Sequence, residues 1–133
     1  LPFFKTEILS NNNLILSSSD FKNKIVLINF FASWCIPCKE EHKILLSLKR
    51  EFPELIIIGI NHKDKKDDAI KFLDNYGDPY DYVGIDEKGE IAYKFGVLGL
   101  PETFLTNDKN KLIFRHAGAL NNEIIDSQIS PFL

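Results

Sequence analysis

Long apolar runs are separated by an amphipathic segment in the first half of the chain. The stretches "KIVLINFF" (24–31) and "LIIIGINH" (55–62) are almost continuously apolar, which is typical of strands buried in the middle of a sheet. Between them, apolar residues recur at helical spacing among Lys and Glu after Pro37, and Pro53 marks the end of that pattern. This part of the chain therefore predicts a strand, a helix and a second buried strand.

Further strands and helices are predicted before and after these elements. The pattern predicts a short strand around 14–16, a helix over 67–77, a strand over 80–86, a short helix over 89–97, a hairpin of 102–107 and 111–118, and a terminal helix over 121–129 with Asn121 as its N-cap. Strands that alternate with helices and then finish in a hairpin indicate an α/β fold with parallel central strands and an antiparallel edge. We expect residues 1–133 to form one domain, because this length suits a single core.

Composition and charge narrow the class of protein. The formal net charge is −3 and no long basic run is present, which argues against nucleic-acid binding. No apolar segment approaches the roughly 20 residues that span a bilayer, and the first residues do not form a basic leader followed by a long apolar stretch. The chain contains no methionine, even at position 1, so we expect that a leader or anchor preceded it and was removed.

Both cysteines lie in "FFASWCIPCKEEH" (30–42), as Cys35 and Cys38. We expect Cys35 where a buried strand ends and a helix begins, because unpaired N–H groups and the helix dipole favour a thiolate there. Cys38 lies one turn further on, within reach of the Cys35 sulfur but more buried. Pro37 fits this turn, since the first helical N–H groups need no partner in the helix. The spacing predicts a reversible dithiol with Cys35 as the accessible nucleophile.

A structural crosslink and a metal site are the alternatives for this pair. A crosslink across so short a loop removes little chain entropy from the unfolded state. A structural zinc site needs four ligands, and His42, His62 and His116 are scattered, with no histidine pair at ligand spacing. A redox dithiol explains the pair better than either, and it requires neither a metal nor a cofactor.

The stretch "GLPETF" (99–104) places a proline at the start of a predicted strand, where its missing N–H is tolerated. A cis bond between Leu100 and Pro101 would place this turn against the dithiol. It would also leave the backbone groups of Leu100 free to pair with an extended peptide. The alternative is an ordinary proline at strand entry.

Together, "INFFASWCIPCKEEH" and "GLPETF" resemble the thioredoxin fold, a three-layer α/β/α arrangement around a mixed sheet. "PETFL", "INHKD" and an extra helix–strand insertion between residues 65 and 86 are similar to the membrane-anchored thiol–disulfide interchange proteins of cytochrome c maturation (the CcmG/DsbE type, TlpA-like). The resemblance covers about residues 20 to 120. One departure is Lys43, where that family usually has a proline, so any kink in this helix should be weaker or absent.

The resemblance implies a periplasmic reductant, tethered to the inner membrane by an N-terminal segment and monomeric. Its dithiol would reduce the haem-site disulfide of apocytochrome c, or a thiol-bearing chaperone that holds this apoprotein, and a membrane thiol reductant would restore the dithiol. Two other functions stay open. One is a general thioredoxin-like disulfide reductase, and the other is a binding module that ferries a metal through Cys35, Cys38 and His42.

The resemblance also assigns roles to residues. Cys35 matches the attacking cysteine and Cys38 the resolving one. The residues expected to border a bound substrate lie before, within and opposite the dithiol, and they are Trp34, Pro37, Leu100, Pro101 (the family's cis-proline) and Gly118 (the glycine beside the groove).

Two carboxylates are candidates for proton transfer at the dithiol. Thioredoxin carries a buried Asp where this chain has Asn29, and an amide cannot act as a base. Glu41 follows Cys38 by three residues on the same helix face, and Glu102 follows Pro101 and could approach from the other side. A partly buried carboxylate beside a dithiol has a raised pKa, can relay a proton and opposes thiolate formation. The alternative is that Glu41 is an exposed helix residue and Glu102 a solvated strand end.

Overall fold

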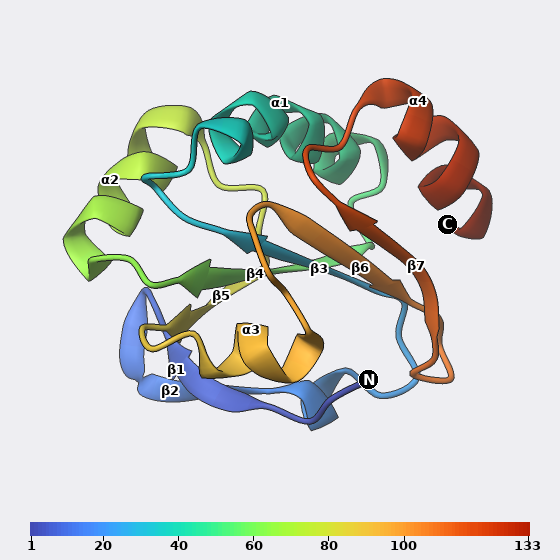
Figure 1. The fold of residues 1–133 in the computed structure, drawn as a ribbon. Helices are drawn as coiled ribbons and strands as arrows, with labels where there is room; N and C mark the ends of the chain where they lie inside the picture. Colours follow the sequence, from blue (N-terminus) through green and yellow to red (C-terminus); the bar gives the residue numbers. More distant parts are fainter.

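The computed structural model describes residues 1–133, which form one mixed seven-stranded sheet with helices on both faces (Figure 1). In chain order the strands are β1 (Lys5–Ile8), β2 (Asn11–Ser17), β3 (Val26–Phe31), β4 (Ile56–His62), β5 (Tyr82–Asp86), β6 (Glu102–Thr106) and β7 (Leu112–Ala117). Their order across the sheet is β2-β1-β5-β4-β3-β6-β7. The β3–β4 and β4–β5 pairs are parallel and all the others are antiparallel.

Helices cover the two faces of the sheet unequally. They are α1 (Ile36–Glu51), α2 (Lys66–Tyr76), α3 (Glu90–Phe95) and α4 (Asn122–Ile124), with α4 continued by a π-helical turn (Ile125–Ile129) and a 3-10 turn (Ser130–Phe132), and a further 3-10 turn at Ser18–Phe21. In Figure 1, α1, α2 and α4 lie on one side of the central strands and α3 on the other. The predicted cap of the last helix is confirmed, because the Asn121 side chain accepts a hydrogen bond from the Ile124 N–H at 2.8 Å.

The alternation of β3 divides the core into two apolar clusters. Leu27 and Phe31 face α1, α2 and α4, and they belong to a cluster that also contains both cysteines. Ile28 and Phe30 face α3 and belong to the second cluster. Asn29 points to the same face as Leu27 and is fully buried, which is unusual for an amide and requires hydrogen-bond partners.

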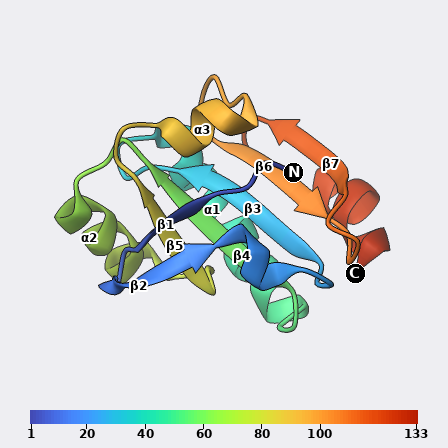
Figure 2. The ribbon, with the colours of Figure 1, turned by 90° about the horizontal axis from the view of Figure 1, so that it is seen from below.

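The N-terminal part of the sheet differs from the prediction. The sequence predicts a strand only around 14–16, but β1 and β2 form a hairpin that pairs with β5 through Ile8 and Gly84, so both edges of the sheet are antiparallel (Figure 2). The segment "KTEI" of β1 has only one apolar residue, so its sequence gives no strand pattern, and it becomes a strand by pairing with β2 along its length and with β5 through Ile8. The other predicted strands and helices are confirmed within a few residues. None of the helices is both long enough and apolar enough to cross a bilayer.

Candidate active site

Cys35 and Cys38 form a disulfide at the start of α1, with their Cα atoms 5.3 Å apart. Cys35 is the N-cap of the helix in an extended backbone conformation, and its Sγ accepts a hydrogen bond from the Cys38 N–H at 3.2 Å. Pro37 lies in the first helical turn, as the sequence predicts. The Cys35 sulfur is therefore positioned where the helix N-terminus stabilises negative charge once the disulfide is reduced.

The expected accessibility of Cys35 is wrong for this disulfide form. Cys35 is 4% exposed and Cys38 2% exposed, so both cysteines are buried and differ little. The cause is local, since the disulfide and the hydrogen bond from Cys38 hold the Cys35 sulfur against the first turn of α1. Exchange at Cys35 therefore requires an approach along its small exposed edge, or rotation of the sulfur after reduction.

The bond between Leu100 and Pro101 is cis, as the resemblance to the interchange proteins implies, and the alternative of an ordinary proline at strand entry is wrong. The Pro101 carbonyl accepts a hydrogen bond from the Gly118 N–H at 2.8 Å, so two of the predicted substrate-binding residues are directly joined. Gly118 has φ +103, a left-handed conformation that side-chain-bearing residues rarely adopt. The N–H and carbonyl of Leu100 form no hydrogen bond within the chain and remain available to an extended peptide.

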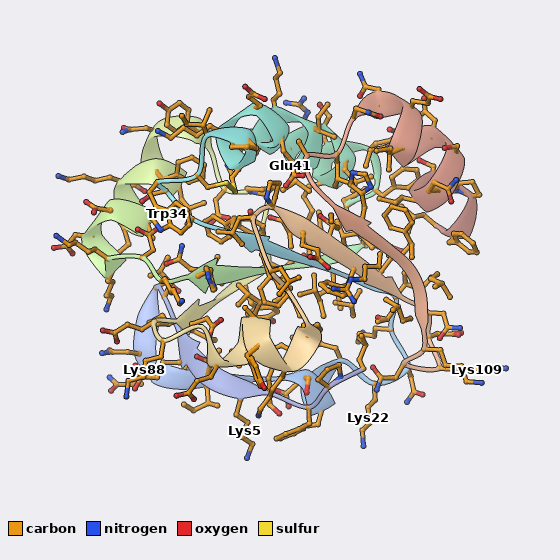
Figure 3. The ribbon with its side chains drawn as sticks, viewed as in Figure 1. Lys5, Lys22, Trp34, Glu41, Lys88 and Lys109 are labelled. Carbon is orange, nitrogen blue, oxygen red and sulfur yellow. A yellow bond between two sulfur atoms is a disulfide. The ribbon has the colours of Figure 1, made fainter.

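Trp34 precedes the disulfide in sequence and is exposed, and a hydrogen bond holds its indole ring in place. Its indole Nε1–H donates to the Lys63 carbonyl at 3.0 Å, while 57% of the residue remains exposed. The neighbouring Ser33 donates to Asp64 through both its N–H and its Oγ at 2.8 Å. In Figure 3, Trp34 lies on the side of the molecule where α2 packs, and Glu41 lies near α1. The sequence motif "INHKD" predicts no role for Asp64. In the structure, Asp64 fixes the loop that leads into the dithiol.

Glu41 is buried within a chain of hydrogen bonds under α1. It is 1% exposed, so the alternative of an exposed helix residue is wrong. One carboxylate oxygen accepts from Asn29 Nδ2 at 2.7 Å and the other from the Leu120 N–H at 2.8 Å. Asn29 Nδ2 also donates to Thr103 Oγ1 at 3.1 Å, and Asn29 Oδ1 accepts from Tyr80 Oη at 2.8 Å.

Burial raises the pKa of Glu41 to about 7. Desolvation is the largest cause, and the hydrogen bonds from Leu120 and Asn29 oppose it by stabilising the carboxylate. Such a carboxyl both gives and takes protons near neutral pH. It lies one helical turn after Cys38, the position from which the sequence predicts proton transfer.

Glu102 does not reach this site. It is buried, but its carboxylate is paired with Arg115 Nε, and Arg115 lies over the ring of Phe104 at 5.0 Å. Phe104 belongs to the apolar cluster that faces α3, opposite the cluster of the cysteines. Strand alternation explains this placement, since Thr103 rather than Glu102 points toward Asn29. The expectation that Glu102 approaches the dithiol is therefore wrong, and the next residue along the strand occupies that face.

His42 does not join the cysteines in a metal site. Its Nε2 hydrogen-bonds with the Gly77 carbonyl at 2.6 Å, and its ring packs edge-on against Phe72. Burial lowers the pKa of His42, which keeps the ring neutral and apolar in character. No three His, Cys, Asp or Glu side chains are arranged to hold a metal ion. Metal transport through Cys35, Cys38 and His42 therefore has no geometric support.

Comparison with known proteins agrees with this geometry. Residues 2–115 match the model of the AhpC/TSA family. The chain belongs to the AhpC/TSA family. Relatives include the thiol:disulfide interchange proteins CycY of Rhizobium leguminosarum bv. viciae (37% identical over 87% of this chain and 62% of that protein) and DsbE of Tatumella citrea (36% identical over 98% and 70%). The chain thus spans a little under two thirds of CycY.

Solved structures in this group share the fold. A thiol:disulfide interchange protein DsbE from Chlorobium tepidum superposes with a TM-score of 0.83 at 26% identity, covering 96% of this chain and 91% of that chain. The Mycobacterium tuberculosis DsbF structure, in mixed oxidised and reduced forms, gives 0.86 at 17% identity over 98% and 95%. The predicted thioredoxin fold with its inserted helix and strand, α2 and β5, is confirmed.

Proposed function

We propose that this protein is a thiol:disulfide oxidoreductase that acts as the reductant of a haem-site disulfide in cytochrome c maturation. The observation that carries the proposal is the Cys35–Cys38 pair at the start of α1, one turn before the buried acid Glu41. The printed names of relatives such as CycY and DsbE support the chemistry. The similarity of "INHKD" and "PETFL" to the cytochrome c maturation branch supports the substrate.

The reaction proceeds through two exchanges at sulfur. In the reduced protein, the Cys35 thiolate attacks one sulfur of the target disulfide and expels the other as a thiolate, which forms a mixed disulfide. The Cys38 thiol then loses its proton and attacks Cys35 Sγ. This step closes the Cys35–Cys38 disulfide and expels the second target sulfur, so the target gains two electrons and the protein loses them.

Glu41 accepts the proton that Cys38 loses in the second step. Cys38 is buried, and a buried thiol forms a thiolate only if a nearby group accepts its proton. Glu41 can accept it near neutral pH, because burial raises the pKa of its carboxyl to about 7. In the reverse direction, a membrane thiol reductant reduces the Cys35–Cys38 disulfide, and the same carboxyl returns the proton to Cys38.

The substrate lies across the turn that contains Pro101. The unpaired backbone groups of Leu100 pair with an extended segment of the target, as an added strand does at a sheet edge. Pro101 and Gly118 border this segment on one side. Trp34 borders it on the other side and supplies an exposed aromatic surface. The apocytochrome c haem site, a Cys-x-x-Cys-His segment, or a thiol-bearing chaperone that holds it, is the partner we assign to this surface.

The proposal places the protein in the periplasm, tethered to the inner membrane by an N-terminal segment and working as a monomer. These assignments rest on the resemblance to the membrane-anchored interchange proteins. The location and the tether are tested by locating the full-length protein in fractionated cells, where it should sediment with the inner membrane and be digested by protease added to spheroplasts.

Trapping tests the reaction and the roles of the two cysteines. Reduced Cys38→Ser protein, mixed with a disulfide-closed Cys-x-x-Cys-His peptide, should accumulate a covalent complex through Cys35. The matched Cys35→Ser protein should trap none. Accumulation with Cys35→Ser instead would reverse the two roles, and no complex with either variant would refute the proposed substrate.

A general disulfide reductase is the second candidate, because the dithiol and its surroundings would serve either function. Insulin distinguishes the two. Rapid reduction of insulin disulfides, at a rate that matches the haem-site peptide, would favour the general reductase. The proposed function predicts slow insulin reduction beside fast reduction of the peptide.

A further inference from the structure

Tyr80 reaches the buried network from the inserted segment of the fold. It lies between α2 and β5, is 7% exposed and stacks on Phe31 with ring centroids 4.7 Å apart. Its hydroxyl donates to Asn29 Oδ1 at 2.8 Å and forms no other hydrogen bond. The insertion therefore contacts the same amide that contacts Glu41.

Gly59 leaves the space through which Tyr80 reaches Asn29. It lies on β4 and is the register partner of Asn29 on β3. A Cβ atom on Gly59 would lie 2.9 Å from Tyr80 Cδ1 and 2.9 Å from Phe31 Cε1, closer than packed side chains approach. Because φ at Gly59 is not in the left-handed region, this glycine is required by space and not by backbone conformation.

The Tyr80 hydroxyl contacts the oxygen of the Asn29 amide, and the amide nitrogen faces Glu41. In the observed orientation Asn29 Oδ1 accepts from Tyr80, and Nδ2 donates to both Glu41 and Thr103. In the flipped orientation Oδ1 would face the Glu41 carboxylate, which is acceptable only if Glu41 is protonated. The flip would also leave the buried Tyr80 proton without an acceptor, and an unmade buried hydrogen bond is costly.

We infer that Tyr80 is a positioning residue whose hydroxyl fixes the Asn29 amide so that its hydrogens face Glu41. This inference rests on the proposed function only in giving Glu41 a task at the dithiol. It extends that function by making the inserted segment between α2 and β5 a support of the active site.

The surroundings of Glu41 contain few titratable groups. The groups that face it from β3, β6 and the segment before α4 are uncharged, and the titratable residues near it or near Tyr80 are Cys38, His42 and Asp78. His42 is directed at Gly77 and is kept neutral by burial, which lowers its pKa. Burial raises the pKa of Tyr80 well above its usual value, so the phenol remains a donor throughout the neutral range.

Titration of the Glu41 carboxyl carbon by NMR in the oxidised protein tests the inference without any thiol chemistry. We expect a midpoint near pH 7 in the wild type. Tyr80→Phe keeps the ring and its stacking on Phe31, but frees Asn29 to flip and accept from protonated Glu41. The titration midpoint of Glu41 in this variant should rise by about one pH unit, because the free energy of one buried hydrogen bond corresponds to a shift of that size. An unchanged or lowered midpoint would overturn the inference.

Two further variants make the result specific. Gly59→Ala should displace the Tyr80 ring and raise the Glu41 midpoint in the same direction. Tyr82→Phe, at a half-exposed tyrosine two residues away that packs against Phe21, should leave it unchanged. An equal rise in Tyr82→Phe would show that the effect is unspecific and would refute a positioning role.

The two proposals fail separately. If the Glu41 midpoint does not move in Tyr80→Phe while peptide disulfides are still reduced, the positioning role is wrong and the proposed function stands. If the midpoint moves as expected but no protein forms a mixed disulfide with the peptide, the proposed function is wrong and the positioning role stands. Where both hold, the pH profile of peptide reduction should move with the Glu41 midpoint.

Discussion

Replacing Glu41 by glutamine should change how stability depends on pH. The carboxyl is buried without a cation, and its pKa is raised from 4.5 to about 7 in the folded protein. Below pH 4.5 the group is protonated in both folded and unfolded chains and its contribution is fully present. Between pH 4.5 and 7 the unfolded chain ionises first, so the wild type loses stability as pH rises. The rise in the pKa of Glu41 corresponds to about 3 kcal/mol in the free energy of unfolding.

The Glu41→Gln variant has no such titration, and its amide resembles the protonated carboxyl in shape and hydrogen bonding. We therefore expect the two oxidised proteins to have similar free energies of unfolding at pH 4. By pH 8 the variant should be the more stable, by about 3 kcal/mol. His42 and Asp78, whose pKa values are also shifted by burial, cancel in this difference because both proteins contain them.

Urea denaturation of the oxidised proteins at half-unit pH intervals measures the difference directly. The disulfide stays closed, so no cysteine titrates. A difference that is flat from pH 4 to 8 would refute the raised pKa. A wild type that gains stability relative to the variant above pH 5 would show that the Asn29 and Leu120 hydrogen bonds outweigh desolvation.

Three other outcomes follow from the site. Glu41→Gln should slow closure of the Cys38 disulfide and lengthen the life of the mixed disulfide, which is measured by quenched gel assays. Trp34→Ala should raise KM for the haem-site peptide about tenfold and change stability by less than about 1 kcal/mol, because the side chain is more than half exposed. Asp64→Asn should lower the free energy of unfolding by about 1–3 kcal/mol through its lost hydrogen bonds to the loop before the dithiol, whereas the exposed Asp68→Asn should not.

Elements with their own local pattern could be predicted from the sequence, and those that depend on distant partners could not. β3 and β4 are apolar along their whole length because both faces are covered, so they are recognisable in isolation. β1 forms a hairpin with β2, but it joins the sheet only through distant residues, because Ile8 pairs with Gly84 and Thr6 bonds to the Ile85 carbonyl, more than 70 residues away. No local signal in "KTEI" carries that information.

The site shows the same division. Glu41 was found because its distance from Cys38 along a helix fixes which face it shares. The place of Glu102 cannot be predicted from the sequence, because the strand register after Pro101 depends on pairing with β3 and puts Thr103 on the face of the cysteines. Tyr80 could not be found, since its contact with Asn29 crosses β4 at a glycine.

Selective alkylation of the reduced protein tests most directly that Cys35 is the exchanging thiol. The protein is treated with limiting iodoacetamide between pH 4 and 9, and the modified cysteine is identified by mass spectrometry. We predict modification of Cys35 alone, with a midpoint clearly below the value of about 8.5 for a free cysteine. Modification of Cys38 first, or of Cys35 only at the pH of an ordinary thiol, would contradict it.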